Sequence, residues 1–170
     1  MNARLAALDE RWTGLIQQAV AQNPRWLRFA PLWAHSGDSI VCYVLLVGGY
    51  VLATPVWRVA ALRLLFLVTL NALVVGALKY LIRRERPAGD WGAVYRVTDP
   101  HSFPSGHAAR TVLIAVDLLL HPPFWPGLLL LIWAGAVTRA RVGLSLHYLS
   151  DILFGAFVGT LLALLGLWLF

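Results

Sequence analysis

The stretch FPSGHAARTVLIAVDLLL, from Phe103 to Leu120, places a serine, a glycine, a histidine and an arginine directly before a run of apolar residues. Similar apolar runs recur along the chain, which indicates helices in a lipid environment. Polar side chains at the end of such a segment are costly in lipid, and those that occur there usually serve a function. The stretch therefore predicts a functional site at one end of a membrane helix.

The composition is that of an integral membrane protein. Of the 170 residues, 59% are hydrophobic and only 13% are charged, with a mean hydropathy of +0.71. A soluble domain is about a quarter charged. At about 20 residues for each crossing, the length suits about five spans. We predict an all-α integral membrane helical bundle with about five transmembrane helices and an N-terminal amphipathic interfacial helix.

The charge and the aromatic residues favour contact with lipid rather than with nucleic acid. The net charge is +6 and there are eight tryptophans, which fits interfacial anchors and contacts to anionic headgroups or phosphates. The basic residues lie between apolar segments and not on a separate polar face, so we expect no nucleic-acid partner. Cys42 is the only cysteine, which leaves no intrachain disulfide.

The apolar segments define the expected spans. Residues 5–20 show amphipathic spacing suited to a membrane surface. The next stretch, NPRWLRFAPLW at residues 23–33, is typical of an interfacial connector. We therefore divide the chain into an interfacial segment, 1–36, and a transmembrane domain, 37–170. The expected spans are about 39–56, 59–82, 105–121, 128–138 and 147–170.

Five crossings would bring the polar clusters to one membrane face. The N-terminal segment, the long loop 83–104 and the turn 139–147 would then share that face. Three motifs lie there: Lys79 followed after six residues by Arg86-Pro87, then Pro104-Ser105-Gly106-His107, then Arg141 followed after five residues by His147 and after three more by Asp151.

These residue types are suited to holding a phosphate. Lysine offers a point charge, and arginine offers a planar fork that matches phosphate oxygens. Ser105 is a good N-cap for the third span, so the backbone N–H groups of Gly106 and His107 would face an anion. Because Gly106 has no side chain, it would let that backbone approach the phosphate closely.

The two histidines suggest separate roles. His147 and Asp151 are four residues apart, and on one helix face the carboxylate would orient the imidazole. His147 is then the expected nucleophile, forming a phosphohistidine, and His107 the general acid and later the base. Nothing gathers a cluster of carboxylates, and the lysine and arginines can neutralise the transferring group, so we expect no metal and no cofactor.

Over about Lys79 to Asp151 the chain resembles the type 2 phosphatidic acid phosphatase superfamily, integral-membrane lipid phosphatases related to glucose-6-phosphatase and vanadium haloperoxidases. All three motifs occur with the family's order and spacings. The resemblance implies that Lys79, Arg86 and Arg141 bind phosphate with Ser105 and Gly106, and it gives His147, His107 and Asp151 the catalytic roles described above. In place of the family's usual serine before the third-motif arginine stands Ala140.

Other polar residues have simpler interpretations. Arg83 and Arg84 read as a positively charged membrane anchor, and Arg110 and Arg139 are left outside the site. Asp117 lies about 18 Å below the start of its helix. Asn71 has a similar expected depth in the second span, so we predict a hydrogen bond between Asn71 and Asp117.

The sequence thus predicts a membrane phosphatase acting on a lipid phosphate or diphosphate. The candidate substrates are a polyprenyl diphosphate such as undecaprenyl diphosphate, phosphatidic acid and phosphatidylglycerophosphate. The alternatives are a non-catalytic binder or transporter of lipid phosphates, and a lipid phosphotransferase. We expect a bacterial inner membrane and, by the resemblance, an extracytoplasmic site, although the positive-inside rule points to the cytoplasmic side. The oligomeric state stays open.

Overall fold

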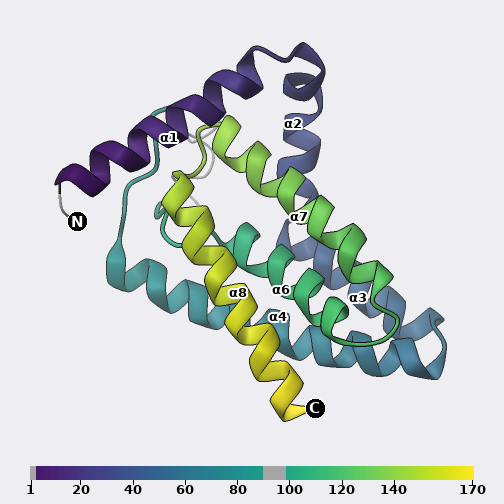
Figure 1. Ribbon diagram of the computed structural model, residues 1–170. Helices are drawn as coiled ribbons and strands as arrows, with labels where there is room; N and C mark the ends of the chain where they lie inside the picture. The colour runs from purple at the N-terminus through teal and green to yellow at the C-terminus, as the bar shows by residue number, and fades with distance from the viewer. Residues whose placement is uncertain (1–2, 90–98) are drawn as a thin grey trace.

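The computed structural model describes residues 3–89 and 99–170, and these described residues form seven helices and no strand. Figure 1 shows α1 crossing one end of the molecule and α6 lying among α4, α7 and α8. The expected all-α bundle is confirmed. The helices are α1 (Ala3–Ala21), α2 (Pro24–Ser36), α3 (Ser39–Leu52), α4 (Pro55–Ile82), α6 (Gly106–Leu120), α7 (Trp125–Gly143) and α8 (Leu149–Leu169).

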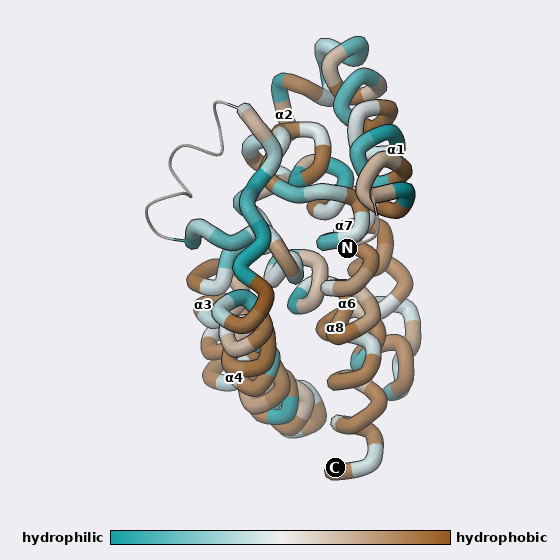
Figure 2. Tube along the Cα trace, turned by 90° about the vertical axis from the view of Figure 1, so that its left-hand side faces the viewer, coloured by the Kyte–Doolittle hydropathy of each residue, from teal (hydrophilic) through white to brown (hydrophobic). Residues whose placement is uncertain are grey.

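Hydrophobic and hydrophilic residues separate along the long direction of the molecule. Figure 2 shows a hydrophobic lower part containing most of α3, α4 and α8, and hydrophilic segments around α1, α2 and the loops at the other end. Among the described helices, α4 and α8 are each long and apolar enough to cross a membrane, and the pair α2 and α3 would make a third span. The count of five crossings stays a prediction.

Residues 24–36 form a helix within the segment that the sequence analysis describes as an interfacial connector. Asn23 caps α2 by accepting a hydrogen bond from the Trp26 backbone N–H at 3.0 Å, and Pro24 begins the helix, where its missing N–H costs nothing. The axes of α2 and α3 are bent by 61° at a short break. Gly37 and Asp38 form this break, and it lies against α6, as the site geometry below shows.

Glycines allow α6 and α8 to pack closely. A Cβ atom added at Gly155 or Gly159 would clash with the backbone of α6, at Ser105 and Ala109 respectively. The spacing of four residues places both glycines on one face of α8. This contact holds the start of α6 against the start of α8, where the second and third motifs lie.

Gly159→Ala is therefore expected to lower the free energy of unfolding by about 1–3 kcal/mol, the usual cost of overpacking. The added methyl group would meet the Ala109 carbonyl oxygen, which belongs to a rigid helix. Gly48→Ala on α3 is the matched control, because nothing lies within 4 Å of its Cβ position. Thermal unfolding in detergent measures both variants. Equal melting temperatures for the two would contradict the close helix contact.

The predicted hydrogen bond between Asn71 and Asp117 is wrong. Asp117 instead forms a buried bidentate ion pair with Arg63 of α4, with Nε to Oδ1 at 3.0 Å and Nη2 to Oδ2 at 2.8 Å. A carboxylate in this setting gains more from a guanidinium than from an amide. Arg63 lies eight residues before Asn71 on α4, about 12 Å along the helix. The end of α4 therefore extends about two turns farther toward the polar end than the sequence suggested.

Candidate active site

Two cations of the first motif converge on one carboxylate. Lys79, in the last turn of α4, donates to both carboxylate oxygens of Asp99 at 2.8 Å and to the His101 carbonyl at 2.6 Å. Arg86, in the segment after α4, donates through Nη2 to Asp99 Oδ2 at 2.9 Å. Both basic side chains are buried. The two cations thus face one point, which the Asp99 carboxylate occupies in this structure.

His147 lies between two guanidinium groups. Arg86 Nη1 is 3.3 Å and Arg141 Nη2 is 3.5 Å from its Nε2 atom. Arginine has no acceptor, so Nε2 must accept, and the proton of the neutral ring resides on Nδ1. Burial and the positive charges of Arg141 and Arg86 lower the pKa of His147 well below its usual range. The ring is therefore neutral, with its Nε2 lone pair directed at the cations.

The link between His147 and Asp151 differs from the expected one. His147 precedes α8, and Tyr148 is the N-cap of this helix. The side chains of His147 and Asp151 therefore do not share a helix face. Asp151 lies in the first turn and accepts from the Tyr148 backbone N–H at 2.9 Å. Its Oδ2 atom is still 3.5 Å from His147 Nδ1. The carboxylate thus lies on the Nδ1 side of the ring, although Nδ1 makes no hydrogen bond to a described residue.

The second motif is joined to the third through the backbone. Ser105 caps α6, as expected, by accepting from the Ala108 N–H at 3.4 Å. The Ser105 backbone N–H donates to the Asp151 carbonyl oxygen at 3.0 Å. Gly106 and His107 form the first turn of α6. The positive end of this helix thus lies beside the cations of the first motif.

Asp38 is a functional candidate that the sequence analysis missed. It lies in the break between α2 and α3, and its Oδ1 atom is 2.6 Å from His107 Nε2. An ionised carboxylate only accepts hydrogen bonds, so His107 Nε2 carries a proton and donates it. Nδ1 of His35 contacts the other carboxylate oxygen of Asp38 at 3.0 Å. The only sequence signal is an acidic residue in Gly-Asp-Ser before an apolar run.

Arg84 is not a membrane anchor, contrary to its expected role. Its guanidinium donates to Asp151 Oδ1 at 2.8 Å and to Asp9 Oδ2 at 2.7 Å. It also lies over the ring of Tyr148, 3.9 Å from the centroid. Arg83, by contrast, is exposed and donates to the Tyr80 carbonyl. Arg84 therefore joins α1 to the candidate catalytic carboxylate.

Helix α1 caps α8 with its own side chains. Asp9 accepts from the Ser150 backbone N–H at 2.9 Å, and Thr13 accepts from the Leu149 N–H at 3.0 Å. These are N–H groups of the first turn of α8, which has no acceptor for them within the helix. Hydrogen bonds from Ser150 and Arg84 lower the pKa of the Asp9 carboxyl despite its partial burial, which acts in the opposite direction.

The remaining polar candidates have structural contacts. Arg110 donates to the Gly37 carbonyl at 2.6 Å and to Ser39 Oγ at 2.8 Å, which fixes the break between α2 and α3 against α6. Arg139 lies over the Trp26 ring, 4.7 Å from its centroid. Ala140, where the family usually has serine, is fully buried against α2.

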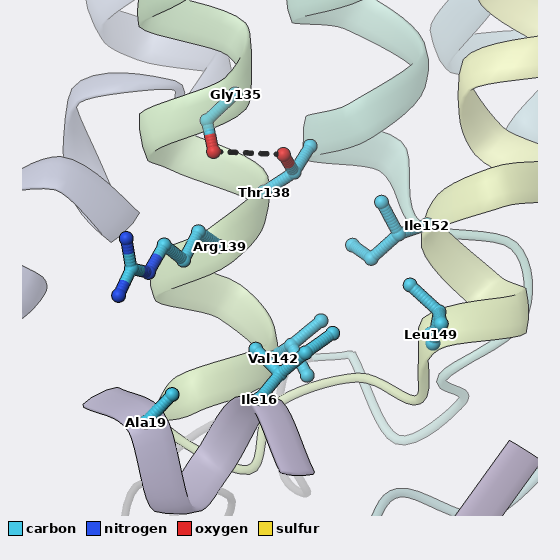
Figure 3. Close-up of a pocket in the computed structure, with 8 residues that line it drawn as sticks. All are labelled: Ile16, Ala19, Gly135, Thr138, Arg139, Val142, Leu149 and Ile152. Atoms are coloured by element: carbon cyan, nitrogen blue, oxygen red, sulfur yellow. Dashed lines mark hydrogen bonds between the residues drawn. The ribbon is translucent and has the colours of Figure 1, made fainter. Parts of the chain in front are cut away.

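Two cavities differ sharply in their lining. A cavity of about 260 Å³ runs between α3, α4 and α6 and is lined by candidate residues that include Lys79, Asp99 and His107. A separate cavity of about 380 Å³ lies between α1, α7 and α8 (Figure 3) and is lined mostly by apolar side chains, with the Thr138 hydroxyl bonded to the Gly135 carbonyl of its own helix. Of these two cavities, the first contains the candidate phosphate ligand Lys79 and the candidate acid His107.

Asp99→Asn is expected to lower the inhibition constant of inorganic phosphate about tenfold. In the structure the Asp99 carboxylate neutralises Lys79 and Arg86, so an incoming phosphate must compete with it for the same donors. Inhibition of lipid hydrolysis by inorganic phosphate measures the effect. Glu85→Gln is a control for the loss of one nearby negative charge. Weaker inhibition in Asp99→Asn than in the wild type would contradict this competition.

Taken together, the site is a cluster of buried cations around two histidines, set at the polar end of an apolar helical bundle. Such a site defines a membrane enzyme that acts on phosphate groups. The family model of the PAP2 superfamily matches residues 60–170, and the chain belongs to this family. It is an integral membrane protein and a lipid phosphatase, as predicted.

Similar proteins include enzymes that act on polyprenyl lipids. The decaprenylphosphoryl-5-phosphoribose phosphatase of Mycolicibacterium smegmatis is 34% identical over 82% of this chain and 77% of its own length. An undecaprenyl-diphosphatase of Sulfolobus acidocaldarius is 34% identical over 56% of this chain, and the match covers only 48% of that relative.

Two solved structures share the fold. LpxE of Aquifex aeolicus superimposes with a TM-score of 0.77 at 23% identity, covering 94% of each chain. The transmembrane PAP2 type phosphatidylglycerolphosphate phosphatase of Bacillus subtilis superimposes with a TM-score of 0.72 at 26% identity, covering 99% of this chain and 87% of the other.

Proposed function

We propose that the protein hydrolyses a terminal phosphate of a polyprenyl-linked lipid through a phosphohistidine at His147. The observation that carries this proposal is the environment of His147 Nε2, which faces Arg86 and Arg141 while Nδ1 faces Asp151. Such a ring is neutral and nucleophilic, and the same guanidinium groups would hold the phosphate that it attacks.

In the first step, Nε2 of His147 forms a bond to phosphorus as the bond to the leaving oxygen breaks. His107 gives its proton to that oxygen. Asp38 holds the Nε2 proton of His107, so the transferred proton comes from Nδ1 and His107 enters this step as the imidazolium ion, with both nitrogens protonated. In the second step, His107 accepts a proton from water, the water oxygen bonds to phosphorus, and the bond to His147 breaks. Lys79, Arg86 and Arg141 balance the charge, so neither step requires a metal.

The named activities of the relatives support the proposed substrate class. The names of the two curated relatives describe phosphates carried on decaprenyl or undecaprenyl lipids. We therefore favour a polyprenyl-linked phosphate or diphosphate over phosphatidic acid and phosphatidylglycerophosphate. A site at the polar end of the bundle would let the tail stay in the bilayer while the phosphate reaches the cations.

Phosphate release from a panel of these lipids, in detergent with a chelator of divalent cations, tests the proposal. Inorganic phosphate should appear from at least one polyprenyl lipid. Addition of glycerol as a competing acceptor should divert part of the phosphate to glycerol phosphate, because a phosphohistidine can react with either hydroxyl. Binding without release would favour a binder or transporter. Transfer to an acceptor with no release in water would favour a phosphotransferase.

We also propose that the protein lies in a bacterial inner membrane with its site on the extracytoplasmic face. The loop 88–99 lies largely outside the described residues, but Ala88 is described and exposed. Ala88→Cys in a Cys42→Ser background should react with a membrane-impermeant maleimide in intact spheroplasts. Phe124→Cys, exposed in the connection before α7, should react only after lysis. The reverse pattern would place the site in the cytoplasm.

A further inference from the structure

Asn71 is a fully buried amide in the middle of the long helix α4. It is 0% exposed, and neither its side-chain nitrogen nor its side-chain oxygen makes a hydrogen bond to any described residue. Buried amides in proteins are almost always paired, because an unpaired one loses its hydrogen bonds to water without replacement. The partner expected from the sequence, Asp117, is occupied by Arg63. The amide therefore needs another explanation.

The side chain lines the same cavity as the candidate active site. Lys79 lies at one end of this cavity of about 260 Å³, and Asn71 lies eight residues earlier on the same helix. That spacing corresponds to about 12 Å, or two helical turns. Ala72 and Gly76 line the cavity between them, and their small side chains leave room along α4. The cavity thus runs from the cations of the phosphate site toward the apolar part of the bundle.

A bound lipid would follow this path with its terminal phosphate at Lys79 and its tail pointing toward the bilayer. The group that meets Asn71 is then neither the scissile phosphate nor the far part of the tail. It is the linker between them. An amide both donates and accepts hydrogen bonds, so it suits a linker that carries hydroxyl or ester groups.

We propose that Asn71 binds a polar linker of the substrate and selects lipids whose terminal phosphate is separated from the tail by such a linker. This inference rests on the proposed function and concerns the group between the terminal phosphate and the tail of the substrate. A simple isoprenyl phosphate or diphosphate has no polar atom beyond its phosphate groups and leaves the amide unpaired. A sugar-linked polyprenyl lipid and a glycerolipid both supply the required chemistry, through hydroxyl groups and ester carbonyls respectively.

The test compares three substrates in the wild type and in Asn71→Leu: geranylgeranyl monophosphate, a polyprenylphosphoryl ribose 5-phosphate, and phosphatidylglycerophosphate. The ratio of kcat/KM for a polar-linker lipid to kcat/KM for the isoprenyl phosphate should fall about tenfold in the variant, the usual effect of losing one buried hydrogen bond. The lipid whose ratio falls identifies the sugar or the ester as the linker. Thr160→Val, which removes a hydroxyl bonded within α8, should leave all ratios unchanged.

Unchanged ratios for both polar-linker lipids would overturn the inference. Asn71→Ala serves as a second variant if leucine disturbs the packing. Stabilisation of each protein by each lipid, measured as a shift in melting temperature, provides a readout that needs no turnover. If the wild type releases no phosphate from any lipid, the proposed function fails. The loss or retention of polar-linker stabilisation in the Asn71 variants then still decides the role of the amide.

Discussion

His147→Ala is expected to reduce the kcat of lipid hydrolysis by about 10⁴-fold or more, which is the scale of losing a covalent nucleophile. Without the imidazole there is no atom at the position that Arg86 and Arg141 both face at 3.3 and 3.5 Å. The cations would remain, so the variant should still bind lipid phosphate. Phosphate release over hours, with binding measured separately, would show a loss in kcat and not in affinity.

Arg83→Ala is the matched control for His147→Ala. Arg83 belongs to the same basic cluster in the sequence but is exposed and bonds only within its own helix end among the described contacts. The activity of Arg83→Ala should stay within about twofold of the wild type, since an exposed charge of this kind contributes little to stability or to the site. Retention of more than about a hundredth of the activity in His147→Ala would exclude the covalent mechanism.

Asp38→Asn is expected to reduce kcat about 100-fold with KM changed less than about threefold. The Asp38 carboxylate is 2.6 Å from His107 Nε2, so it fixes the ring and stabilises its positive charge when the ring is protonated. The asparagine amide removes that charge. A general acid contributes about 10²–10⁴-fold to the rate, and a positioning residue that acts through it should cost a substantial part of that factor.

The leaving group distinguishes this role from a structural one. With an aryl phosphate, whose phenolate leaves without protonation, the loss in Asp38→Asn should shrink to about tenfold or less. The double variant with His107→Ala should be no slower than His107→Ala alone, because both residues act in one step. Glu10→Gln, an exposed carboxylate on α1, is the control. A rise in KM alone, or equal losses for both leaving groups, would contradict the assignment.

The sequence analysis succeeded where the information is local. Apolar runs predicted the helices, and the serine before an apolar segment predicted the N-cap of α6, because both depend on neighbouring residues. The three motifs likewise have fixed internal spacings. The structure brings them together through contacts such as Arg86 to His147 and Ser105 to Asp151.

Apart from the helix face predicted for His147 and Asp151, the errors concern relations between distant segments. Asp38 and His107 are 69 residues apart, and no spacing rule links them. The pairing of Asp117 with Arg63 depends on how far α4 extends past α6, which hydropathy does not specify. Arg84 was assigned by its neighbours in the basic cluster, although its partners come from α1 and α8. In each case the deciding quantity is the relative position of two helices.

The hydrogen bonds from α1 to the start of α8 place part of the support of the candidate site outside the residues that the family model matches. The matched residues begin at 60, whereas Asp9 and Thr13 hold the Ser150 and Leu149 amides. A recombinant fragment of residues 60–170 alone would leave those amides without their side-chain acceptors and Arg84 without one of its two carboxylates. Truncation studies and domain grafts should therefore carry the first helix along with the motifs.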